Sequence, residues 1–272
     1  MQNIVGQKKL VQQLSSYTLA TLPTTILILG PKGSGKSFII DRFAKMLNLV
    51  KVDLTGATTV EDLLEAEQSY ETRLYHIDLV GIDEKKQNKF LKFIEEPNSK
   101  VKIILEAESE VGVLPTILNR CRKFTLEPYT VEELQSFSWA PRSSDVLMYK
   151  FCSTPGQLLE LASTDCFSSL EKLCRDIIIR FPKMTDYEYP RAMSISTKIS
   201  VDKTSPKKYD LNLFLDMLAY VAITIYKETF NPFSLAVYQL TINQQQRILN
   251  KSIAKDAFMF NFLTSLWEAR SV

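Results

Sequence analysis

The sequence predicts an α/β protein whose first half forms a mostly parallel β-sheet and whose second half is helical. Apolar runs rich in β-branched residues alternate with amphipathic stretches as far as Pro128, which is typical of strands joined by helices. A glycine-rich motif lies between the first such run and the first such helix, and beyond Pro128 helical patterns dominate. The 272 residues leave room for two or three domains of roughly 100–200 residues each.

The apolar runs give the order of the sheet elements along the chain. A helix is expected over residues 7–20, before the first strand. Strands are expected at residues 24–30, 50–54, 73–80, 101–107 and 123–128. The segments FIIDRFAKMLNL and EKKQNKFLKFIEE, which follow the first and third strands, have the spacing of amphipathic helices.

The second half of the chain is punctuated by helix signals and one polar segment. Thr130 and Glu133 have the spacing of a capping box, and residues 153–163 read as a turn followed by a short helix. The Ser-, Thr-, Lys- and Pro-rich segment 189–208 is expected to be a loop. We therefore expect an α/β domain over residues 1–128, a small helical domain over 129–165 and an all-helical domain over 166–272.

Composition excludes several classes of protein. The net charge of +2 gives no support for general binding to polyanions. The first residues lack the apolar run of a signal peptide, and the sequence contains no apolar run long enough for a bilayer, so a cytoplasmic protein is expected. The four cysteines form no CxxC pair, which favours buried free thiols over a zinc ribbon or a disulfide framework.

The motif GPKGSGKS, residues 30–37, fits GxxxxGK[ST] at each fixed position, and it follows a strand and precedes a helix. Glycines allow successive backbone N–H groups to point at phosphate oxygens, Lys36 adds a positive charge, and the Ser37 hydroxyl is a magnesium ligand. The expected phosphate-binding residues are Gly30, Lys32, Gly33, Ser34, Gly35, Lys36 and Ser37.

The third strand, RLYHIDLV, ends with a second candidate ligand for magnesium. Asp78 lies where the strand that holds magnesium in an ATPase presents its carboxylate. Ser37 and Asp78 are therefore the predicted metal ligands. Leu79 follows, at the position where a hydrolytic enzyme of this kind usually keeps a Glu that polarises the attacking water.

Two further segments carry a resemblance to a known family. QNKFLKFIEEP (87–97) and PTILNRCRKFTLEPYTVEEL (115–134) resemble motifs of bacterial clamp-loader subunits, the AAA+ proteins that open the sliding clamp for the replicative DNA polymerase. IVGQ (4–7) and STPGQLLEL (153–161) are similar to two more motifs of this family. The motifs occur in the family's order over residues 1–165, and the delta-prime branch is the most similar.

The resemblance implies a set of roles and partners. It implies that ATP or ADP binds with Mg²⁺, that Val5 lies against the adenine, and that Arg120 reaches into the nucleotide pocket of a neighbouring subunit as an arginine finger. It further implies that residues 129–165 are a lid and that residues 166–272 are a collar for oligomerisation. The implied partners are gamma/tau-like and delta-like clamp-loader subunits in a ring, the sliding clamp and primer-template DNA.

Three departures from the family's ATPase subunits point to nucleotide binding with little or no hydrolysis. Leu79 lacks a carboxylate, and Gln157 stands where the lid of an ATPase subunit carries an Arg. Glu106 and Glu108 occupy the segment in which relatives have a polar sensor Thr.

Residues 37–78 contain no Cys, so no zinc site is expected. His76, in an apolar strand, has no visible carboxylate or Cys partner and is expected to be packed or edge-exposed rather than catalytic.

Other functions remain open at this stage. The first is an active clamp-loader ATPase of the gamma or tau type. Less favoured is a P-loop kinase, because the sequence shows neither a lid with clustered Arg nor an acid that would act as the base. A third is an AAA+ interaction protein outside replication. The lysines at positions 85, 86, 89 and 92 are interpreted as a solvated helix face rather than a DNA site.

Overall fold

The computed structural model describes residues 4–55, 71–95, 97, 99–141, 146–163, 167–200, 209–250 and 255–271. Contacts divide the chain into two compact units, Met1–Ala162 and Ser163–Val272, and each is described by itself. The finer division into three domains, with boundaries at residues 128 and 165, stays a prediction.

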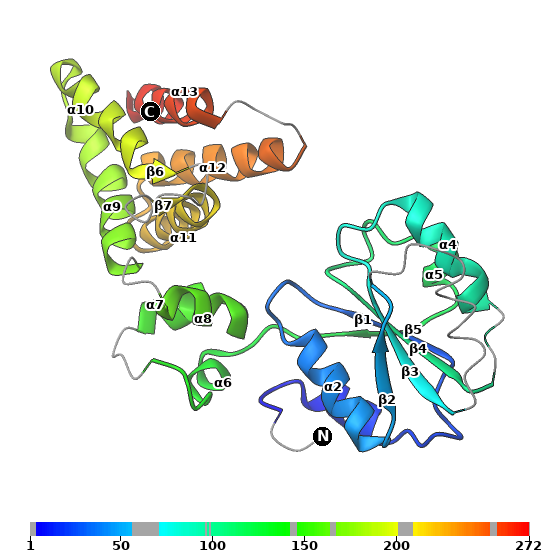
Figure 1. Ribbon diagram of the computed structural model, residues 1–272. Coiled ribbons are helices and arrows are strands. Elements are labelled where there is room, and N and C mark those ends of the chain that lie inside the picture. The colour runs from blue at the N-terminus through cyan, green and yellow to red at the C-terminus, as the bar shows by residue number, and fades with distance from the viewer. Residues whose placement is uncertain are drawn as a thin grey trace. The chain divides into compact units, whose positions relative to one another are not determined.

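The first unit is built on a parallel five-stranded sheet with the order β2-β3-β4-β1-β5 (Figure 1). The strands are β1 Thr25–Leu29, β2 Val50–Asp53, β3 Arg73–Asp78, β4 Val101–Ala107 and β5 Arg122–Thr125. The first four lie within two residues of their predicted bounds, β5 ends three residues before its predicted end, and the predicted α/β fold is confirmed. Strand β4 lies between β1 and β3, so the segments that follow these three strands meet at one edge of the sheet.

Helices α1 Lys8–Ser15 and α2 Lys36–Met46 cover one face of this sheet, and α4 Glu84–Glu95 and α5 Pro115–Leu118 cover the other. The remaining helices of this unit are α6 Val131–Gln135, α7 Val146–Phe151 and α8 Pro155–Ala162. One apolar cluster joins α1 and α2 to the sheet through Leu14, Ile40 and Phe43. A second joins α4 to the opposite face through Phe90 and Phe93. All five residues of β1 are buried, which explains why this strand reads as a continuous apolar run.

Helix α6 begins at the predicted capping box. The Thr130 hydroxyl accepts a hydrogen bond from the Glu133 N–H at 3.2 Å, and the Glu133 carboxylate accepts one from the Thr130 N–H at 3.0 Å. Two donors of the first turn are thereby satisfied. The capping box therefore defines the residue at which α6 begins.

The second unit is helical, as predicted. Its α-helices are α9 Phe167–Arg180, α10 Tyr189–Met193, α11 Leu211–Thr229, α12 Pro232–Asn250 and α13 Lys255–Glu268. Short 3-10 turns cover Phe181–Lys183, Asp186–Glu188, Ser194–Lys198 and Ala269–Ser271. Two-residue strands, β6 Ile199–Ser200 and β7 Tyr209–Asp210, pair in parallel. Among the described residues, no helix combines the length and the apolarity that crossing a membrane requires.

The prediction of a loop over residues 189–208 is wrong for its first half. Residues 189–198 are helical, and 201–208 lie outside the described residues. Tyr189 contacts α13 through its hydroxyl, 3.1 Å from the Thr264 hydroxyl oxygen, and through its ring, 5.4 Å from the Trp267 ring centroid. Ala192 and Met193 are buried. Tertiary burial therefore stabilises a helix whose local sequence pattern is weak.

The cysteine prediction is confirmed for two of the three described residues. Cys152 and Cys174 are buried free thiols, whereas Cys121 is a free thiol that is only partly buried. Burial raises the pKa of the Cys152 thiol to about 12. Cys166 lies outside the described residues.

Candidate functional site

The phosphate loop connects β1 to the amino terminus of α2. Gly33 and Gly35 have φ values of 76° and 89°, and Gly35 is the amino-terminal cap of α2. The first turn of α2 contains no acidic residue, so its unpaired N–H groups and the positive end of the helix dipole favour an anion. The Ser34 hydroxyl is buried inside the loop with no hydrogen-bond partner. This arrangement fits phosphate oxygens.

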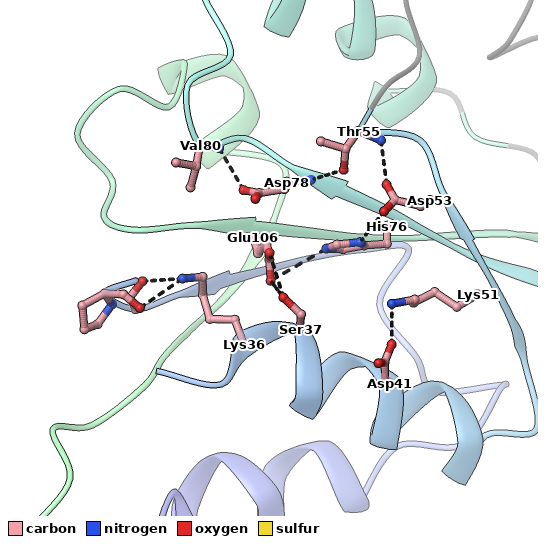
Figure 2. A network of polar contacts seen from close by, with 12 residues as sticks. Lys36, Ser37, Asp41, Lys51, Asp53, Thr55, His76, Asp78, Val80 and Glu106 are labelled. Carbon is pink, nitrogen blue, oxygen red and sulfur yellow. Dashed lines mark hydrogen bonds and ion pairs between the residues drawn. The ribbon is translucent and has the colours of Figure 1, made fainter. Parts of the chain in front are cut away.

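Lys36 lies over the loop that precedes it. Its Nζ donates hydrogen bonds to the carbonyl oxygens of Gly30 at 2.7 Å and Pro31 at 3.2 Å, and the residue is only 8% exposed. The loop carbonyls therefore hold the ammonium group at the place where a phosphate would meet it. Figure 2 shows this contact beside Ser37.

Ser37 contacts a buried acid that the sequence prediction did not include among the site residues. Its hydroxyl donates to the two carboxylate oxygens of Glu106, at 3.1 and 3.2 Å. Glu106 is 5% exposed and lies in β4, paired with Ile28 of β1 and Asp78 of β3. The sequence signal for it was an acid inside the apolar run IILEA.

His76, in β3, continues this network next to the Glu106 carboxylate (Figure 2). Its Nε2 lies 3.8 Å from Glu106 Oε2, and its Nδ1 lies 3.8 Å from Asp53 Oδ2. Both distances are too long for hydrogen bonds, and neither ring nitrogen has a hydrogen-bond partner. The expectation of a packed side chain is confirmed, since His76 is 5% exposed. The expectation that it has no carboxylate nearby is wrong, because the strand register brings two acids beside it.

Two acids of this network have pKa values below their ordinary ones. Burial acts to raise the pKa of Glu106, but the neighbouring His76, the Ser37 hydroxyl and the charge of Lys36 outweigh it and lower the pKa. Desolvation likewise opposes ionisation of Asp53, whereas the hydrogen bonds from Thr55 and the charges of His76 and Lys51 lower its pKa. Both carboxyl groups are consequently ionised at neutral pH.

The side chains of Asp78 and Leu79, at the end of β3, lie in different environments, one polar and one apolar. Asp78 is partly buried, its N–H donates to the Thr55 hydroxyl, and its Oδ1 accepts from the Val80 N–H, both at 2.9 Å. Its place beside Glu106 in the sheet puts a second carboxylate at this edge. Leu79 is 4% exposed and belongs to the apolar cluster under α4.

The segment before α8 lies directly on the phosphate loop. The Gly156 N–H donates to the Gly33 carbonyl at 2.9 Å, and the Thr154 hydroxyl donates to the Lys32 carbonyl at 3.4 Å. A Cβ atom on Gly33 would lie 2.9 Å from Gly156 Cα, so the two backbones are in contact. Gln157 accepts hydrogen bonds from the Ser153 N–H and hydroxyl, and thus its side chain closes the turn before its own helix.

The amino-terminal motif is fastened to the segment after β5. The Gln7 amide donates to the Glu127 carbonyl at 2.6 Å and accepts from the Glu127 N–H at 2.8 Å. Val5, the predicted contact for the adenine, is partly buried two residues before Gln7. The Tyr129 hydroxyl then donates to the Ser34 carbonyl at 3.0 Å, which links the same segment to the phosphate loop.

Arg120 lies in the turn between α5 and β5. Its guanidinium donates to the Thr116 carbonyl at 2.9 Å and forms an ion pair with Glu95 at 3.0 Å. The Arg120 side chain is 42% exposed. The two motifs EEP and NRC, 25 residues apart when counted from Glu95 to Arg120, therefore meet through their charged side chains at the surface.

Fold and loop together define the class of protein. A parallel sheet in the order β2-β3-β4-β1-β5 with a phosphate loop after β1 and small helices packed on that loop is an AAA+ P-loop fold. The same fold occurs in the RuvB Holliday junction branch migration motor of Thermotoga maritima, with a TM-score of 0.50 and 16% identity. That likeness covers 82% of this chain and 78% of that one.

Comparisons of the sequence with known proteins find similarity to subunits of DNA polymerase III. A family model described as "DNA polymerase III, delta subunit" matches residues 64–130. DNA polymerase III subunit gamma of Buchnera aphidicola subsp. Baizongia pistaciae is 28% identical over 167 residues, which are 48% of this chain and 45% of that protein. Subunit tau of Escherichia coli is 28% identical over 168 residues, 49% of this chain and 26% of tau.

Over about half of its length the chain is similar to clamp-loader subunits of DNA polymerase III. Its matches span less than half the length of these curated relatives.

Proposed function

We propose that this chain is a delta-prime-like subunit of a DNA polymerase III clamp loader, which binds nucleotide, hydrolyses little or none of it, and assists a neighbouring subunit. The observation that carries the proposal is the contrast at one edge of the sheet. The phosphate loop is complete through Lys36 and Ser37, whereas Leu79 places a leucine in the apolar core where a water-polarising carboxylate is needed.

Nucleotide binding is supported by the loop geometry. The N–H groups of the loop and of the first turn of α2, together with Lys36, would hold the phosphates of ATP or ADP. Ser37 and Asp78 would hold Mg²⁺, which neutralises phosphate charge when bound. Val5 would lie against the base, as the family resemblance implies.

Weak hydrolysis is supported by two side chains. Leu79 has no group that can orient a water, and it is buried among apolar residues. Gln157 carries no charge, and its side-chain oxygen is already engaged by Ser153. Loss of such contacts lowers the rate of phosphoryl transfer while leaving the affinity for nucleotide in place.

Arg120 supports a role in a neighbour's site. An arginine finger must lie at a surface, because it stabilises charge on a nucleotide held by another subunit. The Arg120 guanidinium is exposed and held in place by Glu95. The partners that this function requires are gamma/tau-like and delta-like subunits, the sliding clamp and primer-template DNA.

One observation favours a second candidate, an active ATPase of the gamma or tau type. The two curated relatives described above are subunits of that type, and the phosphate loop keeps each residue of the motif. Only the rate of hydrolysis by the pure chain separates the two candidates.

The test compares the unaltered chain with Lys36→Ala in two measurements. Titration calorimetry with ADP and Mg²⁺ should show binding by the unaltered chain and at least about tenfold weaker binding by K36A, because the phosphates lose a positive charge. Steady-state ATP hydrolysis should be equal for the two proteins and at background. Hydrolysis by the unaltered chain that K36A abolishes would instead identify the gamma or tau type. Equal binding by both proteins would contradict use of the loop.

A further inference from the structure

Among the described contacts, the phosphate-loop residue Ser37 is hydrogen-bonded to the carboxylate of Glu106 and not to that of Asp78. Both Glu106 oxygens lie 3.1–3.2 Å from the Ser37 hydroxyl oxygen, whereas the Asp78 carboxylate accepts a hydrogen bond from the turn of its own chain at Val80. Glu106 is also the more buried of the two acids, at 5% exposure. A buried carboxylate at this place requires a physical explanation, because removing a charge from water is costly.

The Glu106 oxygens lie beside the hydroxyl that is predicted to hold the cation. The Ser37 hydroxyl donates to both of them, at 3.1 and 3.2 Å. Mg²⁺ prefers oxygen ligands and is usually bound by one or two carboxylates together with phosphate oxygens. A cation on the Ser37 hydroxyl would therefore be within reach of Glu106, directly or through one bound water.

The surroundings of Glu106 leave its carboxylate available to the phosphate loop. His76 Nε2 lies 3.8 Å from Glu106 Oε2, which is too far for a hydrogen bond. The face of Glu106 toward the phosphate loop is bound only by Ser37 among the described contacts.

We propose that Glu106 is a carboxylate of the divalent-cation site and makes nucleotide binding conditional on the cation. With Mg²⁺ present, Glu106 and Ser37 hold it against the phosphates. Without the cation, the Glu106 charge opposes the phosphates that the loop would otherwise attract. This inference rests on the proposed nucleotide-binding function and adds a residue and a regulation to that site.

The test measures the dissociation constant of ADP in excess Mg²⁺ and again in excess EDTA, by calorimetry on the full chain. For the unaltered chain, the EDTA value should exceed the Mg²⁺ value by about tenfold or more, the scale of one nearby charge of like sign. Glu106→Gln keeps the size and a hydrogen-bonding oxygen for Ser37 but removes the charge. For E106Q, the ratio of the dissociation constant in EDTA to that in Mg²⁺ should fall to about threefold or less, because ADP binds more weakly with Mg²⁺ and more tightly without it.

The matched control is Glu108→Gln, which removes an exposed carboxylate two residues further along the same segment and should keep the unaltered ratio. Binding of Mn²⁺ in the presence of ADP, followed by electron paramagnetic resonance, supplies a second readout and should weaken in E106Q only. If E106Q does not fold by circular dichroism, Glu106→Asp, which keeps the charge, takes its place and should retain a ratio near that of the unaltered chain.

Three outcomes overturn the inference. An unchanged ratio in E106Q, with binding still sensitive to Lys36→Ala, shows that nucleotide binds but that Glu106 does not serve the cation. A ratio below about threefold in the unaltered chain shows that binding needs no cation to offset a repulsive charge. Absence of ADP binding by the unaltered chain under both conditions overturns the nucleotide-binding proposal itself and this inference with it.

Discussion

At the scale of single residues, the proposed arginine finger depends on the surface ion pair of Arg120 with Glu95. The pair with Glu95 is 40–42% exposed, and such pairs contribute about 0–1 kcal/mol to stability. Its value for the fold is therefore small. What the pair does is hold a long, flexible side chain in one direction, so that less conformational entropy is lost when the guanidinium meets a second anion.

Arg120→Ala is expected to lower ATP hydrolysis by the assembled clamp loader while leaving the isolated chain folded. The neighbouring site should slow by about a thousandfold, the lower end of the range for arginine fingers in trans. The ATP hydrolysis rate of the whole complex should then fall by the fraction that the neighbouring site contributes. The measurement is steady-state hydrolysis by the reconstituted complex with clamp and primed DNA.

The matched control for Arg120→Ala is Arg122→Ala. Arg122 lies two positions further on, in β5, exposed and over the Phe124 ring at 6.0 Å. The R122A complex should hydrolyse ATP at the unaltered rate. Full activity of the R120A complex would contradict the arginine-finger role.

At the residue scale, a local loop can be predicted from its own sequence, whereas a contact that depends on strand pairing cannot. The loop from Gly30 to Ser37 forms one local structure, so its geometry follows from its own residues. The contact between Ser37 and Glu106 depends on the pairing of β4 with β1 and β3. Residues 69 positions apart cannot be joined by local spacing alone, so Glu106 was noted as a departure but not as a site residue.

At the scale of elements, the contact between the phosphate loop and the start of α8 depends on two glycines. Gly33 has a positive φ and touches the Gly156 backbone, and a Cβ on Gly156 would lie 2.5 Å from Gly33 Cα. Any side chain at either position would separate the two elements. The start of α8 is therefore held against the loop by contact between the two backbones.

Gly33→Ala should destabilise the first unit more than Gly35→Ala does. Both carry the cost of about 1–2 kcal/mol for a left-handed backbone. Only Gly33→Ala adds a clash with backbone, since a Cβ on Gly35 would have the Tyr129 hydroxyl at 3.7 Å as its neighbour. Urea unfolding measures the difference, and hydrogen exchange should show faster exchange of residues 154–162 in G33A than in G35A. Equal exchange in the two variants would argue against the contact.

The helix over Tyr189–Met193 shows why element prediction failed in the polar segment. Five residues are too few for a stable isolated helix, so local propensity carries little information there. Burial of Ala192 and Met193 and the contacts of Tyr189 with Trp267 and Thr264 supply the stabilisation. These partners lie more than 70 residues further along the chain, beyond the reach of any sequence window.

At the scale of the whole molecule, two compact units with separate cores imply separate responses to core substitution. Phe262 in α13 is 1% exposed and stacks on Phe258, with ring centroids 6.2 Å apart. Phe262→Ala should cost the second unit about 3–5 kcal/mol. Hydrogen exchange under native conditions should accelerate within residues 163–272 while β1 to β5 keep their protection.

Phe260→Ala is the matched control, because Phe260 lies in the same helix but is 48% exposed. Its effect on stability should stay within about 0.5 kcal/mol. Loss of protection in the sheet of F262A, equal to the loss in α13, would contradict the independence of the two cores.

The segment from Glu127 to Glu133 has a consequence for how the molecule can move. Gln7 binds the backbone of Glu127 on both sides, Tyr129 reaches Ser34, and the capping box fixes Thr130 to Glu133. A stretch pinned at three successive points cannot serve as a hinge. Any swing of α7 and α8 in response to a ligand would have to pivot beyond α6, so the short helix travels with the sheet as part of its rigid frame.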